Sequence, residues 1–340
     1  MPKSSIAMVP GDSDMCKKYL ITGGDGFIGV NLSKFLISRG DYVHIIDNNI
    51  TSNPVFKHNR LSRTICEVEN FSVDQLPWSP DCIFHLASVA VPTLYMEKPK
   101  LVISPNVFGT MKICEIAMEV GARVVFTSTS EVYGSSMDNF PSGTKVSESN
   151  VSLSSMLTVR SPYSISKKMG EEILTHMMNS EYSRCSVRLF NVVGPNMDTK
   201  TTSYGRVVPN FLRALRNREP LPIYGAGMQT RSFLWIEDAV DALVKIGDFE
   251  GNLPFCMNIG NPNATTILEL ARKFEEISGI NVGVSHSERL PEEPFHRCPD
   301  ISLAKKVINW SPQKNLDEII AKILEGLIFY VKYKFTSFSI

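Results

Sequence analysis

The sequence predicts an α/β fold in which a doubly wound parallel sheet is joined to a smaller C-terminal domain. Three observations support this prediction. Short apolar runs alternate with helix-like stretches in the first half of the chain, a pattern typical of parallel strands connected by helices. The octet T-G-G-D-G-F-I-G, at residues 22–29, joins the first of these strands to the first helix. Beyond residue 190, repeated prolines divide the chain into shorter elements, as expected of a smaller domain.

The expected elements alternate along the chain. Strands are expected at residues 18–21, 42–47, 63–68, 82–87, 123–129 and 184–190. Helices are expected at residues 27–38, 100–120 and 163–179, and the Ser-, Asn- and Gly-rich residues 135–159 are expected to be mostly loop. We therefore expect a Rossmann domain at residues 17–190, with part of 233–260 returning to it. The substrate-binding domain is expected at 191–232 and 261–330, with tails at 1–16 and 331–340.

The composition excludes several classes of partner. The 340 residues suffice for a large core, and Lys plus Arg equal Asp plus Glu at 35 each. This balance provides no overall field for nucleic acid or an acidic membrane surface, and we expect no apolar run of membrane-spanning length. The seven cysteines are scattered without metal-ligand spacing. We therefore expect no metal site and a cytoplasmic location, where thiols stay reduced.

The octet predicts a dinucleotide site, because Gly24, Gly26 and Gly29 fit the pattern G-x-G-x-x-G. In this pattern the first glycine permits a tight turn, the second lets the backbone approach a pyrophosphate, and the third allows close packing of helix on strand. The helix that begins at Phe27 directs its N-terminal N–H groups toward that phosphate. A glycine-rich turn without a ligand is the alternative, and the flanking strands favour the dinucleotide site.

Asp47 predicts which dinucleotide binds. It lies 18 residues after the octet, near the position at which an acidic side chain binds a ribose 2′-hydroxyl. A carboxylate there repels a 2′-phosphate, and Asn48 and Asn49 beside it supply no cation to bind one. We therefore expect NAD rather than NADP. Arg60 and Arg63 qualify this expectation only if they fold back toward the site.

Two polar segments predict a reaction centre. Tyr163 and Lys167 are four residues apart, so on a helix they share one face. A nearby ammonium and a positive nicotinamide both stabilise a phenolate, so we expect a lowered pKa of Tyr163 and a role as a base for a sugar hydroxyl. A surface Tyr–Lys pair is the alternative. Thr129, Ser130 and Glu131 favour the reaction centre because they follow a predicted strand, and ligands bind at the carboxyl ends of parallel strands.

A set of motifs resembles those of the extended short-chain dehydrogenase/reductase family. In chain order they are T-G-G-D-G-F-I-G, H-L-A-S, S-T-S-E-V-Y-G, Y-S-I-S-K and R-L-F-N-V-V-G-P, and the resemblance covers about residues 17–330. This family contains NAD-dependent nucleotide-sugar epimerases, dehydratases and decarboxylases. Within it, the runs H-L-A-S-V-A-V-P-T-L-Y-M-E-K-P, S-T-S-E and G-R-V-V-P-N-F make the sequence most similar to the UDP-glucuronate decarboxylases, which make UDP-xylose.

The resemblance implies a role for each matching position. Tyr163 removes the proton of the C4 hydroxyl, Lys167 orients it and binds the nicotinamide ribose, and Thr129 bonds the C4 oxygen. Ser130 and Glu131 assist at C5 once oxidation by NAD⁺ has produced a 4-keto sugar. Further cofactor contacts are implied for Gly23, Gly26, Phe27, Ile28, Gly29, Asp47, Asn48, Asn49, Glu67, Val68, Leu86, Ala87, Ser88 and Asn106. Contacts to a UDP-sugar substrate are implied for Ser88, Asn191, Val208, Tyr224, Gln229, Arg231 and Arg297, with Val208 and Tyr224 beside the uracil and the two arginines on phosphate or ribose oxygens.

One position departs from the decarboxylase pattern. Asn196 stands where these enzymes carry an arginine near the sugar carboxylate, and Arg160 and Lys200 are the candidates to compensate. The expected reaction is decarboxylation of UDP-glucuronate to UDP-xylose. C4-epimerisation and 4,6- or 5,6-dehydration of a nucleotide sugar are the alternatives, as is a regulatory protein that binds NAD without turnover. The resemblance also implies a homodimer formed through the helices at 100–120 and 163–179.

Overall fold

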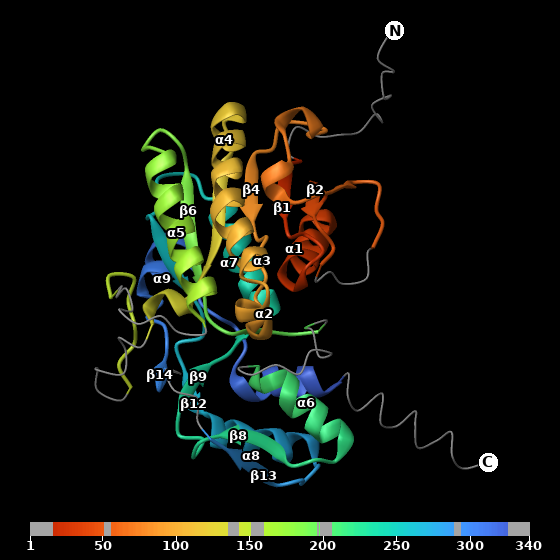
Figure 1. Cartoon of the computed structure of the whole chain (residues 1–340), viewed down its shortest axis with the longest axis vertical. Coiled ribbons are helices and arrows are strands. Elements are labelled where there is room, and N and C mark those ends of the chain that lie inside the picture. Colours follow the sequence, from red (N-terminus) through yellow and green to blue (C-terminus); the bar gives the residue numbers. More distant parts are fainter. Residues whose placement is uncertain are drawn as a thin grey trace, which may run out of the picture.

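A seven-stranded parallel sheet forms the centre of the larger unit of the molecule (Figure 1), with the strand order β3-β2-β1-β4-β5-β6-β11. The computed structural model describes residues 16–50, 56–134, 143–150, 160–195, 197, 206–288 and 294–325, and the structural statements below refer to these residues. The strands are β1 (Lys18–Thr22), β2 (Tyr42–Asp47), β3 (Leu61–Ile65), β4 (Cys82–His85), β5 (Arg123–Thr129), β6 (Arg184–Leu189) and β11 (Cys256–Ile259). The predicted fold class is confirmed.

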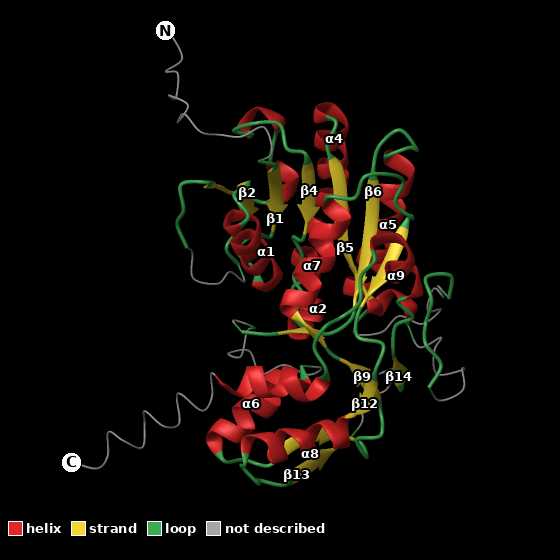
Figure 2. Ribbon diagram, turned by 180° about the vertical axis from the view of Figure 1, so that it is seen from behind, coloured by secondary structure: helices red, strands yellow, loops and turns green. Residues whose placement is uncertain are grey.

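Helices cover both faces of the sheet, because alternate strand residues point to opposite faces. On one face, Ile21 and Val125 share a core with α1 (Phe27–Ser38) and α7 (Ile236–Gly247). On the other face, Leu20 and Val124 share a second core with α4 (Thr110–Val120) and α5 (Ser161–Met177). Figure 2 shows the sheet between these layers. Strands buried on both faces explain the continuous apolar runs in the sequence.

The predicted helix at 100–120 contains an irregular turn. It consists of α3 (Pro99–Ser104), a π-helical turn at Pro105–Gly109, and α4. Pro105 has no N–H to donate to the preceding turn, and a π turn is a common way to accommodate such an interruption. By length and composition alone, Pro99–Val120 is apolar enough to cross a membrane, so the prediction that no such run exists was wrong. In the structure, α4 packs against β4, β5 and α5.

The smaller unit lies beyond the carboxyl ends of the central strands (Figure 1). It contains the parallel pair β8 and β13, which packs with α6 and α8, and the three-stranded sheet β12-β9-β14. The bounds of these elements are α6 (Val207–Asn217), β8 (Leu221–Tyr224), β9 (Thr230–Ser232), β12 (Ala264–Thr266), α8 (Ile267–Ser278), β13 (Val284–Ser287) and β14 (His296–Arg297). The short pair β7 (Val192–Val193) and β10 (Leu234–Trp235) joins the two units.

The C-terminal part of the described chain packs on the large unit. The helix α9 (Ser302–Ile308) contacts β11 and α7, and Trp310 donates its indole N–H to the carbonyl oxygen of Asp238 at 3.1 Å. This segment belongs by its contacts to the Rossmann unit, whereas the sequence prediction assigned it to the substrate-binding domain. The remaining domain boundaries stay predictions.

Several predicted element bounds differ from the structure. β3 begins and ends earlier than predicted, because Val68 starts a one-turn 3₁₀ helix (Val68–Asn70). A short helix, α2 (Pro92–Glu97), was not predicted, and it positions a residue of the site described below. Of the predicted loop at 135–159, only residues 143–150 are described.

Candidate active site

The glycine-rich octet forms a tight loop between β1 and α1. Gly23 has a φ of +67°, and a Cβ placed there would lie 2.8 Å from the backbone of Ala87. A Cβ on Gly29 would lie 2.4 Å from the carbonyl oxygen of Gly23, so the helix packs directly on the loop. Gly26 is the N-cap of α1 and makes no side-chain cap, and no acidic residue lies in the first turn, where Phe27 and Ile28 stand. A helix start of this kind suits a phosphate, because its N–H groups and positive dipole end attract an anion.

Asp47 ends β2 beside this loop. One of its carboxylate oxygens accepts the N–H of Asn49 at 2.8 Å, and the other accepts the N–H of Asp25 at 3.0 Å. Burial raises the pKa of Asp47. Asn48 donates to Glu67 at 2.9 Å, which brings these two predicted adenosine-side residues together.

Arg63 folds back toward the glycine loop, so its charge bears on whether NAD or NADP binds. Its Nε donates to both carboxylate oxygens of Asp25, at 3.1 and 3.2 Å, and its charge acts to lower the pKa of Asp47. Arg60 instead donates to the carbonyl oxygen of Gly40.

The carboxyl end of β4 supplies the facing wall. The N–H groups of Leu86 and Ala87 donate to the backbone and side-chain oxygens of Thr22, at 3.0 and 3.2 Å. The hydroxyl of Ser88 is buried and makes no hydrogen bond in the structure, so it has capacity for a ligand. Together with the uncapped start of α1, this buried hydroxyl fits a bound dinucleotide.

Asn106 and Val68 lie behind this wall. Asn106 is fully buried in the π-helical turn, and its amide donates to the carbonyl oxygen of Val102 and to the hydroxyl of Ser166, both at 2.9 Å. The amide therefore fastens the turn to α5, a contact that the predicted cofactor role did not include. Val68 is buried beside Gly109, whose added Cβ would lie 2.4 Å from it.

The predicted reaction centre is assembled by α5 and the end of β5. The side chain of Thr129 acts to lower the pKa of the Tyr163 hydroxyl, which places the two groups together. Lys167 is 1% exposed, donates to the carbonyl oxygen of Thr127 at 2.6 Å and lies 4.7 Å from the centre of the Phe126 ring. These contacts place both side chains at the carboxyl edge of the sheet, close to Ser130.

The pKa values at this centre differ from the sequence expectation. Burial raises the pKa of Tyr163 to about 12, and burial lowers the pKa of Lys167 to about 7. From the sequence we expected a lowered pKa of Tyr163. In the protein alone, the ammonium of Lys167 does not offset the effect of burial on the pKa of Tyr163, because it bonds Thr127 and is itself desolvated. The positive charge of the nicotinamide, which was the other reason for a lowered pKa, belongs to the cofactor.

Tyr95 is a site residue that sequence reasoning missed. It comes from α2, and its ring is stacked on that of Tyr163 with centroids 5.0 Å apart and an interplanar angle of 2°. Tyr95 is buried, so it also shields one face of the Tyr163 ring from water. Tyr95 belongs to the run H-L-A-S-V-A-V-P-T-L-Y-M-E-K-P, but local spacing in the sequence did not indicate that its ring would contact Tyr163.

Glu131 lies between two arginines. Its Oε1 accepts from Arg160 at 2.7 Å and from Arg297 at 3.0 Å. Although burial raises the pKa of Glu131, the charges and hydrogen bonds of the two arginines lower it to about 2. We call these three side chains the Arg–Glu–Arg cluster. Arg297 was predicted to hold phosphate or ribose oxygens, whereas the structure pairs it with the residue predicted to act at C5.

The remaining predicted substrate residues gather on the smaller unit. Arg231 and Arg297 are paired in register on β9 and β14, and Gln229 donates to the carbonyl oxygen of Tyr224 at 3.0 Å. The amide of Asn191 donates to the carbonyl oxygen of Ser232 at 2.8 Å. Val208 is 3% exposed and belongs to the hydrophobic core, so the structure does not place it as an exposed wall for uracil. Asn196 and Lys200 lie outside the described residues.

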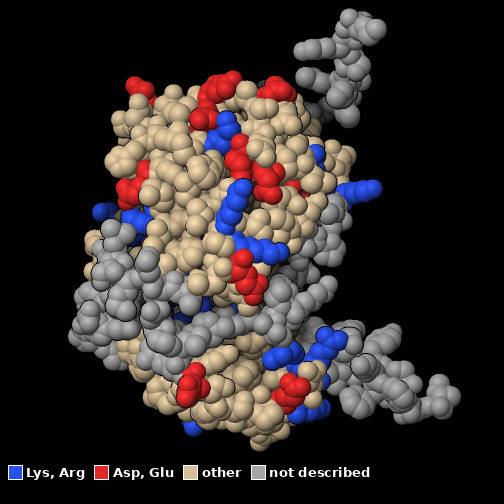
Figure 3. Space-filling view, viewed as in Figure 1, with Lys and Arg blue, Asp and Glu red and all other residues tan. Residues whose placement is uncertain are grey.

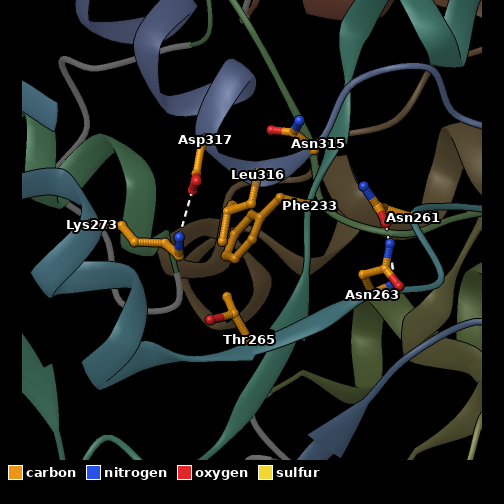
Figure 4. Close-up of a pocket in the computed structure, with 8 residues that line it drawn as sticks. All are labelled: Phe233, Asn261, Asn263, Thr265, Lys273, Asn315, Leu316 and Asp317. Atoms are coloured by element: carbon orange, nitrogen blue, oxygen red, sulfur yellow. Dashed lines mark hydrogen bonds and ion pairs between the residues drawn. The ribbon is translucent and has the colours of Figure 1, made fainter.

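A hollow of about 230 Å³ is lined by other residues (Figure 4). It is lined by Phe233, Asn261, Asn263, Thr265, Lys273, Asn315, Leu316 and Asp317, and an ion pair of 2.6 Å joins Lys273 to Asp317 across it. It contains none of the predicted site residues. Within the described part of the chain, no three His, Cys, Asp or Glu side chains are grouped to hold a metal ion.

The dinucleotide loop and the buried Tyr–Lys pair, at one edge of a doubly wound sheet, define a Rossmann-fold enzyme that uses NAD. Comparison with known proteins identifies the family within this class. The chain belongs to the NAD dependent epimerase/dehydratase family, whose model matches residues 19–260. The family expected from the motifs, and NAD as its cofactor, are therefore confirmed.

Three similar proteins illustrate the range of this family. UDP-glucuronic acid decarboxylase 2 of Arabidopsis thaliana is 34% identical over 88% of this chain, which spans 65% of that protein's length. The UDP-glucuronic acid 4-epimerase of Bacillus cereus, solved with UDP-glucuronic acid and NAD, has a TM-score of 0.81 and is 25% identical, with 92% of this chain and 99% of that chain covered. The UDP-N-acetylglucosamine 4-epimerase of Methanobrevibacter ruminantium has a TM-score of 0.83 and is 25% identical, with coverage of 93% and 99%.

Proposed function

We propose that this protein decarboxylates UDP-glucuronate to UDP-xylose through a transient 4-keto sugar. The observation that carries the proposal is the Arg–Glu–Arg cluster beside Thr129 and Tyr163. Two guanidinium groups and one carboxylate leave a net charge of +1 among these three side chains, which matches one sugar carboxylate. The identity to UDP-glucuronic acid decarboxylase 2 supports the same substrate.

Arg160 supplies the cation that the substitution at Asn196 removes. It lies at the start of α5, three residues before Tyr163, and its ion pair to Glu131 fixes its guanidinium at the reaction centre. A substrate carboxylate that binds there is oriented with its C–C bond near the hydroxyls of Thr129 and Tyr163. Glu131 acts as a positioning residue because it holds both arginines in place.

The proposed chemistry follows from these positions. A bound NAD⁺ would supply the acceptor for the C4 hydride and the source from which it returns. Tyr163 takes the proton of the C4 hydroxyl, and Thr129 holds the C4 oxygen. Once C4 is a ketone, the C5 carboxylate leaves as CO₂ and its bonding electrons move toward the C4 oxygen. The hydroxyls of Tyr163 and Thr129 stabilise the enolate that forms. A proton from water adds to C5, and the returned hydride at C4 together with the proton from Tyr163 on the C4 oxygen completes UDP-xylose.

The state of Glu131 favours decarboxylation over dehydration. Dehydration requires a base that removes the C5 proton, and a carboxylate with a pKa of about 2 in two ion pairs is a weak base. Decarboxylation needs no such base, because the electrons come from the C–C bond. C4-epimerisation is the second candidate, supported by the likeness to the Bacillus cereus epimerase.

The experiment is incubation of the purified protein with NAD⁺ and a panel of UDP-, dTDP- and GDP-sugars, followed by mass spectrometry. A UDP-sugar product lighter by CO₂ supports the proposal. Unchanged mass with a new retention time indicates epimerisation, and loss of water indicates dehydration.

We also propose that the protein acts as a homodimer in the cytoplasm. The exposed apolar side chains Ile103, Phe108 and Met111 from the 99–120 helix, and Ile165 and Met169 from α5, lie on two neighbouring helices. Figure 3 shows charges of both signs interspersed over the molecule on the side viewed in Figure 1. A second copy that pairs the same two helices buries this apolar surface. All seven cysteines are unpaired, as expected in a reducing compartment.

A further inference from the structure

We propose that Asp25 is a specificity-determining residue for the cofactor. By holding the guanidinium of Arg63, it keeps that group from binding a 2′-phosphate and so favours NAD over NADP. Asp25 stands inside the glycine loop, between Gly24 and Gly26, and its side chain is 2% exposed. Burying a carboxylate without a partner raises the free energy of the folded state, so we expect the Asp25–Arg63 ion pair to be a fixed part of the loop.

The sheet register brings Arg63 to the loop. Arg63 on β3 is paired with Ile45 on β2, and paired residues of adjacent strands point to the same face. Ile45 lies directly beneath the loop, since a Cβ on Gly24 would lie 2.5 Å from its side chain. The guanidinium also lies over the ring of Phe56, with 5.6 Å to the ring centroid. Arg63 is thus held at the loop by two neighbours.

The pair is linked to the residue expected to bind the ribose. The backbone N–H of Asp25 donates to Asp47, and the charges of both Asp25 and Arg63 act on the Asp47 carboxyl. These three side chains comprise two carboxylates and one guanidinium, with a net charge of −1. A ribose 2′-hydroxyl donates to such a cluster, whereas a 2′-phosphate is repelled by it.

Neutralising Asp25 changes both the net charge of these three side chains and the hold on Arg63. The Asp25→Asn variant keeps the backbone N–H to Asp47 and the side-chain size, but it brings the cluster to zero net charge and releases Arg63. Arginine is the residue best suited to bidentate binding of phosphate. Removing Arg63 has a different effect, because it leaves the carboxylate of Asp25 uncompensated in a loop that faces the cofactor pyrophosphate.

The test measures the affinities of NAD⁺ and NADP⁺ by isothermal titration calorimetry on the 340-residue chain stripped of bound nucleotide. For Asp25→Asn we expect NADP⁺ to bind about tenfold more tightly, equivalent to about 1.4 kcal/mol, with a gain that shrinks at high salt. The double variant Asp25→Asn/Arg63→Leu should lose this gain. Asp241→Asn, which removes an exposed carboxylate paired with Lys245 on α7, is the matched control and should leave both affinities unchanged.

Two results would overturn the proposal. One is a folded Asp25→Asn protein whose NAD⁺ to NADP⁺ preference is unchanged, and the other is a double variant that keeps the gain. If Asp25→Asn does not fold, Arg63→Leu provides the test, with NAD⁺ binding expected to weaken about tenfold and NADP⁺ binding not to improve. Unchanged NAD⁺ binding, or improved NADP⁺ binding, in that variant would equally contradict it. Since only cofactor affinity is read, the outcome is independent of which sugar reaction the protein performs.

Discussion

Arg297 donates to the Oε1 atom of Glu131 at 3.0 Å, although the two residues are 166 positions apart in the sequence. Glu131 follows β5 of the large unit, and Arg297 lies on β14 of the smaller unit. The contact therefore joins the two units at the reaction centre. It also gives the cluster an excess of positive charge at the place where a sugar carboxylate is expected.

The Arg–Glu–Arg cluster predicts a specific effect of Arg160→Gln. We expect the KM for UDP-glucuronate to rise roughly 10- to 100-fold, because a hydrogen bond to a charged group contributes roughly 1.5–3 kcal/mol. Inhibition by UDP-glucose, which lacks the carboxylate, should be unchanged. Steady-state kinetics with both ligands measures the difference, with Arg213→Gln on the exposed side of α6 as the control. Equal weakening of both ligands would mean that Arg160 does not recognise the carboxylate.

The stack of Tyr95 on Tyr163 predicts that the ring, rather than the hydroxyl, of Tyr95 matters. Tyr95→Phe keeps the ring and should retain kcat within about twofold, whereas Tyr95→Leu removes the stacking partner and should lower kcat on the order of tenfold, since aromatic pairs contribute roughly 0.5–1.5 kcal/mol. Single-turnover kinetics distinguishes the two. Equal activity of both variants would show that the stack has no role in turnover.

Burial of Lys167 predicts a pH-dependent contribution to stability. The folded-state pKa of Lys167 is lowered from 10.5 to about 7, so between these values the unfolded state binds more protons than the folded state. The contribution of Lys167 to the free energy of unfolding therefore rises with pH in this interval, and below about pH 7 its buried charge is at its most destabilising. Urea denaturation at about pH 7 and pH 9 should show that the free energy of unfolding of the wild type rises relative to that of Lys167→Met, by at most about 1.4 kcal/mol per pH unit. A difference independent of pH would argue against a depressed pKa.

The apolar helix face predicts the effect of surface charges on assembly. Phe108→Glu and Met169→Glu place carboxylates on side chains that are 58% and 48% exposed in one subunit, so folding should be retained. Light scattering after size exclusion should report a dimer for the wild type and a monomer for the double variant. Ile65→Glu alters an exposed apolar residue on β3, at the edge of the sheet, and should leave the dimer intact. A wild-type monomer would refute the proposed dimer.

Local patterns in the sequence were enough to predict the sheet, the glycine loop and the Tyr163–Lys167 pair. Strand periodicity, glycine spacing and a four-residue helical interval each depend on neighbours in the chain. The contacts that local spacing could not reveal join distant segments: Tyr95 on Tyr163, Arg297 on Glu131, and Arg63 on Asp25. The position of Val208 in the core was missed for a similar reason, since its surroundings depend on how α6 packs in the smaller unit.

The most direct measurement is release of labelled CO₂ from UDP-glucuronate that carries a carbon isotope in its carboxylate. With NAD⁺ present, we predict labelled CO₂ and UDP-xylose in equal amounts from the wild type. Tyr163→Phe, which keeps the ring on Tyr95 but lacks the base, should lose roughly 10²–10⁴-fold in rate while still binding NAD⁺. Retention of the label in a UDP-uronate product, or turnover of only neutral UDP-hexoses, would contradict the account.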